Sequence, residues 1–194
     1  EGQMIASILS KKRSAGSTHL LLDIPVGATA KVRSMEVAAS LRREFEYVAK
    51  QIGLHIEVMT SNGEQPVGRG VGPVLEARDI TAVLENSEGA PPDLREHALQ
   101  LAGRALEFAE DVKGGDGYGL ALEILRSGRA LQKFQAIVEA QGRRDNTPSL
   151  GAYTFEVKAE RAGRITQMDN FAIARLAKLA GAPLNKGAGV EVLH

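Results

Sequence analysis

Two polar side chains near the start of the sequence have a spacing that could bind a small ligand. Ser7 and Lys11 are four residues apart in a segment whose apolar residues recur at helical spacing, so both would lie on one face of a helix. A hydroxyl and an ammonium group on the same face can hold a carbonyl oxygen or an anion together. The alternative is structural: Lys11 would interact only with the helix dipole, and Ser7 would fill a surface position.

A lysine follows the most apolar segment of the sequence. Residues 19–24 (HLLLDI) are typical of a strand buried on both faces, and the loop after them contains Thr29 and Lys31. Ligands of open α/β sheets bind beyond the carboxyl ends of the strands, where a lysine can serve as a point charge for phosphate. Lys31 is therefore a candidate phosphate ligand or, alternatively, an ordinary surface lysine. Asp23 could contribute to the same site or only cap the loop.

A second loop, residues 61–73 (SNGEQPVGRGVGP), contains four glycines. It matches neither the dinucleotide-binding glycine pattern nor the P-loop lysine motif. Its exposed carbonyl groups could instead coordinate a cation, together with Asp79 on the helix that follows. The four histidines have no mutual spacing typical of a metal site, so ordinary structural roles are expected for them.

The apolar periodicity and the capping signals predict an α/β core followed by an incomplete α+β region. The two strands of the core, at 19–24 and 55–60, should be parallel because a helix joins them, with a right-handed crossover. Ser34 and Asn170 are the expected N-caps of two helices, and Asp93 with Glu96 resembles a capping box. The expected helices are 3–14, about 35–52, 73–85, 94–111, 120–126, 129–140 and 171–180; strands at 153–160 and 164–169 would form a hairpin.

Composition narrows the class of protein. The 194 residues include 24 Lys and Arg against 24 Asp and Glu, and this balance disfavours a nucleic-acid partner. The sequence contains no cysteine, which excludes disulfides and thiolate metal sites. No apolar run approaches the ~20 residues that span a bilayer, so no membrane association is expected. No secretory signal is recognisable, and we expect a cytoplasmic protein. Without an initiator methionine, the sequence is expected to be a piece of a longer chain.

Four segments together resemble the thymidine phosphorylase family of nucleoside phosphorylases. They are GQMIASILSKK, GSTHLLLDIPVG, QPVGRGVGPVLEARD and GAPLNKGAGV. Within the family they most resemble the AMP phosphorylases and the bacterial proteins usually called putative thymidine phosphorylases. The resemblance runs from Gly2 to about Val190. It implies that 1–15 is the last helix of a small helical domain, that 16–148 is most of a central α/β phosphorylase domain, and that 149–194 begins a C-terminal α+β domain.

The resemblance also implies a reaction. A nucleoside or a nucleoside 5′-monophosphate would react with inorganic phosphate, as co-substrate, to give free base and a (deoxy)ribose 1-phosphate sugar; no cofactor is implied. Ser7 and Lys11 match residues that contact the nucleobase, and Lys31 matches a lysine that contacts AMP. Pyrimidine nucleoside phosphorylases have an aromatic residue at that position, in a GAFM-like segment, where this sequence has GATAKV. Both thymidine and AMP remain candidate substrates.

The resemblance implies further features, which rest on fewer matching residues. Some pyrimidine nucleoside phosphorylases bind K⁺, and the match would place the carbonyl groups of Val67 and Gly70 and the carboxylate of Asp79 around it. The family usually has glutamate where Asp79 stands. The proton donor and the phosphate-binding residues would lie upstream of Glu1, so no catalytic residue is assigned here and this piece alone should be inactive. The whole enzyme is expected to be a homodimer or a higher homo-oligomer.

Two alternatives belong to other classes. An anthranilate phosphoribosyltransferase-like enzyme would use Mg²⁺ held by an Asp-Glu pair and a G-T-G-G-D loop, and neither motif occurs in these residues. A non-catalytic interaction module would present a wide apolar face, whereas each expected helix has one apolar stripe. Binding of phosphate and nucleobases would distinguish an enzyme from such a module.

Overall fold

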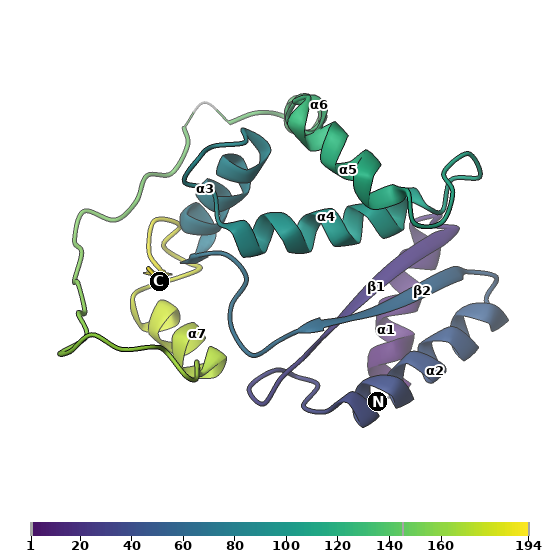
Figure 1. The fold of residues 1–194 in the computed structure, drawn as a ribbon, viewed down its shortest axis with the longest axis horizontal. Helices are drawn as coiled ribbons and strands as arrows, with labels where there is room; N and C mark the ends of the chain where they lie inside the picture. Colours follow the sequence, from purple (N-terminus) through teal and green to yellow (C-terminus); the bar gives the residue numbers. More distant parts are fainter. Residues whose placement is uncertain (1, 145, 194) are drawn as a thin grey trace. The chain divides into compact units, whose positions relative to one another are not determined.

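The computed structural model is a mixed α/β structure that describes residues 2–144 and 146–193 (Figure 1). The chain divides into two compact units. The first comprises Glu1–Glu64 and Gln100–Tyr118, and the second comprises Gln65–Leu99 and Gly119–His194.

The first unit contains two helices and a parallel two-stranded sheet. Its elements are α1 (Gly2–Ser14), β1 (His19–Val26), α2 (Met35–Gln51) and β2 (His55–Asn62). The strands pair in parallel over their full lengths, as predicted, from His19 opposite His55 to Val26 opposite Asn62. One apolar cluster joins helices and strands, and its most buried members include Ile5, Leu9, Ala38, Leu41, Phe45, Ala49 and Val58.

Local signals define the ends of α2 as expected. The Ser34 side chain accepts a hydrogen bond from the Val37 amide, which confirms the predicted N-cap. Beyond the helix, Gly53 has a φ of +67°, a left-handed conformation that favours glycine. These caps fix the direction in which the chain enters and leaves the crossover helix.

The expectation that β1 is buried on both faces is wrong. Most of its residues are only partly buried, and Ile24 is the one that is fully buried. Among the described residues β1 pairs only with β2, so the strand has less cover than an inner strand of a wide sheet. The strand is also longer than predicted and includes Pro25, which lies near its end.

The second unit is mainly helical. Its elements include β3 (Gly70–Val71), α3 (Pro73–Leu84), α6 (Arg129–Ala140), α7 (Asn170–Leu179) and β4 (Val190–Glu191). The helices α4 (Pro92–Leu106) and α5 (Gly117–Arg126) contain residues of both units. The strands β3 and β4 pair antiparallel, with Gly70 opposite Glu191 and Val71 opposite Val190. In the part of the chain that the structure describes, every helix is too short or too polar to cross a membrane.

The predicted hairpin at 153–160 and 164–169 is wrong. Neither segment forms a strand, and Tyr153, Phe155 and Val157 have exposed fractions of 99%, 91% and 83%. The alternation that suggested a strand stabilises one only when a second strand and an apolar surface are available, and the described residues place neither against these side chains.

Two helix starts also differ from the prediction. The N-cap of α7 is Asp169 rather than Asn170: its carboxylate accepts hydrogen bonds from the amides of Phe171 and Ala172. The helix α4 starts at Pro92, so Asp93 lies within its first turn rather than capping it. A carboxylate at either position still faces the positive end of its helix dipole.

Candidate functional site

The carboxyl ends of β1 and β2 lie side by side, and one polar contact joins them. The Ser61 hydroxyl donates a hydrogen bond of 2.9 Å to Oδ2 of Asp23, in partly buried surroundings. In the strand register Asp23 lies opposite Met59, two residues before Ser61, so alternation places both side chains on the same face. Sequence reasoning singled out Asp23 but missed Ser61, whose only signal was this register.

Two glycines bring the loops that follow these strands into direct contact. A Cβ atom built on Gly27 would lie 2.5 Å from the carbonyl carbon of Gly63, and the Gly63 amide donates to the Val26 carbonyl at 2.8 Å. The loop then turns back on itself, since the Gly27 amide donates to the Val32 carbonyl at 3.1 Å. These backbone contacts therefore help to fix the position of Lys31 within this turn.

Lys31 is exposed on this loop. Among residues 2–144 and 146–193 its ammonium group has neither an ion pair nor a hydrogen bond. A lysine without a carboxylate partner can contact an anionic ligand without first breaking an ion pair. The structure thus places the predicted phosphate ligand at the carboxyl edge of the sheet, where the sequence analysis expected it.

Ser7 and Lys11 lie on the exposed side of α1. The opposite side carries Ile5 and Leu9, which are 2% and 1% exposed, so the helical spacing separates the apolar and polar faces as predicted. All three candidate substrate ligands belong to the first unit. No contact between described side chains joins Lys31 to either α1 residue, so the structure does not itself bring the three together.

An apolar pocket of about 170 Å³ lies between α1 and α2. It is lined by Gly2, Ile5, Ala6, Glu44, Tyr47 and Val48. Binding sites for polar ligands combine apolar walls with several convergent polar groups. Glu44 is the single charged residue of this lining, so the pocket does not fit a phosphate or a nucleoside.

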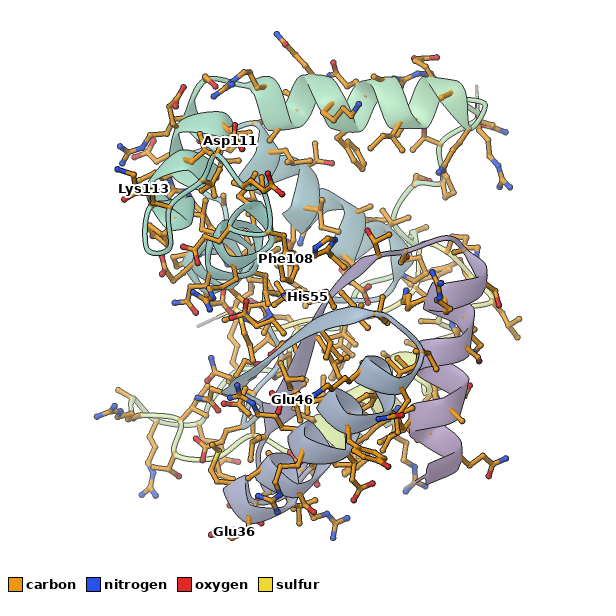
Figure 2. All side chains as sticks on the ribbon, turned by 90° about the vertical axis from the view of Figure 1, so that its right-hand side faces the viewer. Glu36, Glu46, His55, Phe108, Asp111 and Lys113 are labelled. Atoms are coloured by element: carbon orange, nitrogen blue, oxygen red, sulfur yellow. The ribbon has the colours of Figure 1, made fainter. Side chains whose placement is uncertain are left out.

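The amino ends of the two strands carry an aromatic cluster. The ring centroids of His19 and His55 are 5.1 Å apart, and Phe108 lies against both at 5.3 and 5.7 Å; Figure 2 shows His55 and Phe108 as neighbours. Next to this cluster, a hydrogen bond from Arg104 to Glu57 raises the pKa of the arginine. No group of three or more histidine, aspartate or glutamate side chains suited to a metal occurs in the described part of the chain.

The residues of the expected cation site lie together in the second unit. Asp79 projects from α3 and is 5% exposed. Its Oδ2 accepts hydrogen bonds from the amides of Arg69 and Gly70, at 2.8 and 2.7 Å. Val67 lies in the same loop and is 41% exposed. Sequence reasoning missed Asp93 as a partner of this loop: its Oδ2 accepts from the Gly68 amide at 2.9 Å.

Comparison with known proteins finds relatives along the whole chain, although no family model matches it. A protein of Methylococcus capsulatus named "Putative thymidine phosphorylase" is 60% identical over 194 residues, which is 100% of this chain. Proteins of the same name from Albidiferax ferrireducens and a Bradyrhizobium strain are 57% and 54% identical over 196 and 190 residues. The chain matches a segment of the thymidine phosphorylase family.

The match covers the whole chain but only part of each relative. The chain spans 38% of the length of the Methylococcus capsulatus and Albidiferax ferrireducens proteins. The aligned segment includes every position that the family resemblance assigns to substrate, namely Ser7, Lys11 and Lys31. The match therefore confirms the resemblance to the thymidine phosphorylase family that the four sequence segments indicated, and it leaves the roles of individual residues to be tested.

Proposed function

We propose that the chain is part of a pentosyltransferase that cleaves a nucleoside or a nucleoside 5′-monophosphate with inorganic phosphate. The observation that carries this proposal is the 60% identity, along the entire chain, to a relative named "Putative thymidine phosphorylase". In the proposed reaction a phosphate oxygen forms a bond to the anomeric carbon while the bond from that carbon to the base nitrogen breaks. The bonding electron pair leaves with the base, which then takes up a proton.

In this reaction Ser7 and Lys11 contact the departing base. Negative charge develops on the base as its bond to the sugar breaks, and an ammonium group placed near a ring carbonyl stabilises that charge. Both side chains are exposed on one face of a helix whose other face is anchored in the core. Such an anchored helix holds its polar groups in place before substrate arrives, which reduces the ordering cost of binding.

Lys31 contacts the 5′-phosphate of a nucleotide substrate, which favours AMP over thymidine. Support comes from its exposed position at the carboxyl edge and from a loop held by the Gly27–Gly63 contact. The name of the relatives favours thymidine, and thymidine offers no phosphate to Lys31. Lys31 should therefore contribute to binding of AMP but not to binding of thymidine.

The first experiment compares kcat/KM of the full-length enzyme for phosphate-dependent base release from AMP and from thymidine. A preference for AMP of ~100-fold, about 2.7 kcal/mol of transition-state discrimination, supports the role given to Lys31. A preference for thymidine removes that role and leaves the family reaction intact. Base release from neither substrate, nor from the other common nucleosides and nucleoside 5′-monophosphates, at any phosphate concentration, overturns the proposed reaction itself.

A variant then tests the lysine directly. Lys31→Gln should lower kcat/KM for AMP by ~10–100-fold, because one charge-assisted contact is worth about 1.5–3 kcal/mol, and should leave thymidine unaffected. Lys50→Gln is the matched control, since Lys50 is an exposed lysine in the last turn of α2. Equal losses with both substrates would contradict a contact to the 5′-phosphate.

The proposal extends to the assembly. The active enzyme is a cytoplasmic homodimer or higher homo-oligomer. It needs phosphate as co-substrate and uses no cofactor. Residues 1–194 alone are inactive, because the family resemblance places the proton donor outside them. Sedimentation of the full-length enzyme measures its oligomeric state. Base release by the purified 194-residue chain would disprove the claim of inactivity.

A further inference from the structure

Three consecutive amides of the glycine-rich loop all donate to carboxylates. The Gly68 amide donates to Oδ2 of Asp93, and the amides of Arg69 and Gly70 donate to Oδ2 of Asp79. Gly68 has a φ of +80°, and a left-handed residue in such a run curves the chain so that successive N–H groups point into one concavity. The concavity is filled by side-chain oxygens of this chain itself.

The surroundings of Asp79 do not fit a bound monovalent cation. Its Oδ2 already accepts two N–H groups at 2.8 and 2.7 Å, and its Oδ1 lies 4.0 Å from the guanidinium of Arg78. Arg78 itself forms an ion pair with Glu191, so the closest contacts of the Asp79 carboxylate are to the two backbone N–H groups. A cation needs oxygen atoms directed at it, whereas Oδ2 of Asp79, one of its expected ligands, already accepts the N–H groups of Arg69 and Gly70. The Oδ2 atom of Asp79 is therefore directed at backbone N–H groups rather than left free for a cation.

The held loop carries contacts to a distant part of the sequence. Gly70 begins β3, which pairs with β4, and the carbonyl of Arg69 accepts a hydrogen bond of 2.9 Å from the Val192 amide. The amide of Gly72 donates to the carboxylate of Glu76 at 3.0 Å, at the start of α3. Fixing the backbone of 68–70 therefore also fixes the strand and the helix that follow it.

We propose that Asp79 and Asp93 form a carboxylate clasp, which holds the amides of Gly68, Arg69 and Gly70 and makes the loop independent of any bound K⁺. In a cation site the loop would fold around a positive charge, whereas in the clasp it folds around the two negatively charged carboxylates. The proposal goes beyond the proposed function and does not depend on it, because the loop conformation can be measured without a substrate.

The reach of the aspartate side chain is part of the clasp. A Cβ atom on Gly68 would lie 3.1 Å from Oδ2 of Asp79, so the loop backbone sits close around the carboxylate. Glutamate is one methylene longer and would push the oxygen into this backbone, yet it keeps the charge that a cation ligand requires. Asp79→Glu therefore separates the two interpretations: the clasp loses its geometry, whereas a cation site retains its ligand type.

The test measures the thermal midpoint Tm of the full-length enzyme in KCl, NaCl and tetramethylammonium chloride at one ionic strength. The clasp predicts the same Tm in all three salts. It also predicts that Asp79→Glu and Asp79→Ala lower Tm by at least a few degrees, equally in each salt. The matched control is Glu88→Gln, an exposed acid in the turn before α4, which should leave Tm unchanged.

Hydrogen exchange of the peptide covering 66–72 gives a second readout. Its amides should be protected in the unmodified enzyme in every salt, and Asp93→Asn should speed their exchange without unfolding the rest of the chain. A Tm that rises in KCl over tetramethylammonium chloride, with the increment lost in Asp79→Ala, would overturn the proposal and show a K⁺ site. The salt comparison on the unmodified enzyme distinguishes the carboxylate clasp from a K⁺ site even if a variant fails to fold.

Discussion

Substituting Gly27 tests the idea that backbone contacts position the loop that carries Lys31. In Gly27→Ala the new methyl group would lie 2.5 Å from the Gly63 carbonyl carbon, 2.6 Å from its oxygen and 2.8 Å from the Glu64 nitrogen. All three atoms are backbone, so no side chain can rotate away and the loops must separate by about 1 Å to reach ordinary contact distance. Overpacking of this kind costs about 1–3 kcal/mol.

The separation should also weaken a hydrogen bond. The Gly63 amide donates to the Val26 carbonyl at 2.8 Å, and loss of such a bond costs about 1 kcal/mol. The expected total for Gly27→Ala is therefore about 2–4 kcal/mol of unfolding free energy. If Lys31 binds a 5′-phosphate, kcat/KM for AMP should fall as well, because the lysine moves with its loop.

Urea unfolding of the full-length enzyme measures the first effect, and base release from AMP measures the second. Gly119→Ala is the control: Gly119 lies in α5 with nothing within 4 Å of its built Cβ, so alanine should be neutral or stabilise the helix by up to about 1 kcal/mol. A loss below about 0.5 kcal/mol for Gly27→Ala, with unchanged activity, would refute the claim that the two loops hold each other in place.

Two further predictions concern charged groups at the surface of the first unit. Arg104→Met removes the ion pairs with both Glu57 and Glu107. The arginine side chain is 45% exposed, so screening limits the expected loss to about 1 kcal/mol or less for each pair. Urea unfolding at low and high salt should show the loss shrink as salt rises. A hydrogen bond to Ser34 lowers the pKa of Glu36. A carboxyl group whose pKa is lower in the folded state stabilises the protein at pH values above its unfolded-state pKa, and this stabilisation is lost as pH falls through the folded-state pKa. Glu36→Gln should therefore destabilise the protein at neutral pH and have no effect on its stability in strong acid. Thermal midpoints that differ from those of the parent protein equally at both pH values would contradict this assignment.

Elements whose ends depend on neighbouring residues could be predicted from the sequence. The limits of α2 follow from Ser34 and Gly53, which act on backbone groups a few residues away. The parallel pairing of β1 and β2 follows from the helix between them, since a crossover of that length cannot form a hairpin. The exposed face of α1 follows from the spacing of Ile5 and Leu9.

Features that depend on distant partners could not be predicted. Asp93 has the sequence context of a helix cap, yet its carboxylate accepts an amide from Gly68, 25 residues earlier. The short strand β3 forms only because Val190 and Glu191 return to pair with it. Residues 153–160 show the opposite case, in which a strand-like alternation has no partner strand among the described residues.

Strand register accounts for the main difference between the predicted and the observed candidate site. Ser61 joins Asp23 only through the register between two strands, and one-dimensional patterns do not contain register. Lys31 could be placed at the carboxyl edge because it follows directly after a strand. Sequence therefore located the ligand candidates on single elements, whereas contacts between elements required the structure.

In the 194-residue chain by itself, the exposed segment from Tyr153 to Ile165 has a consequence for proteolysis. Its backbone forms no helix or strand, and such segments are the first that a protease cleaves. The carboxyl-terminal product of such a cut would carry β4, which is paired with β3, and the Lys186 carbonyl, which accepts the Val74 amide at 3.1 Å. The nicked 194-residue chain should consequently run as two bands under denaturing conditions while the pieces stay associated in native buffer.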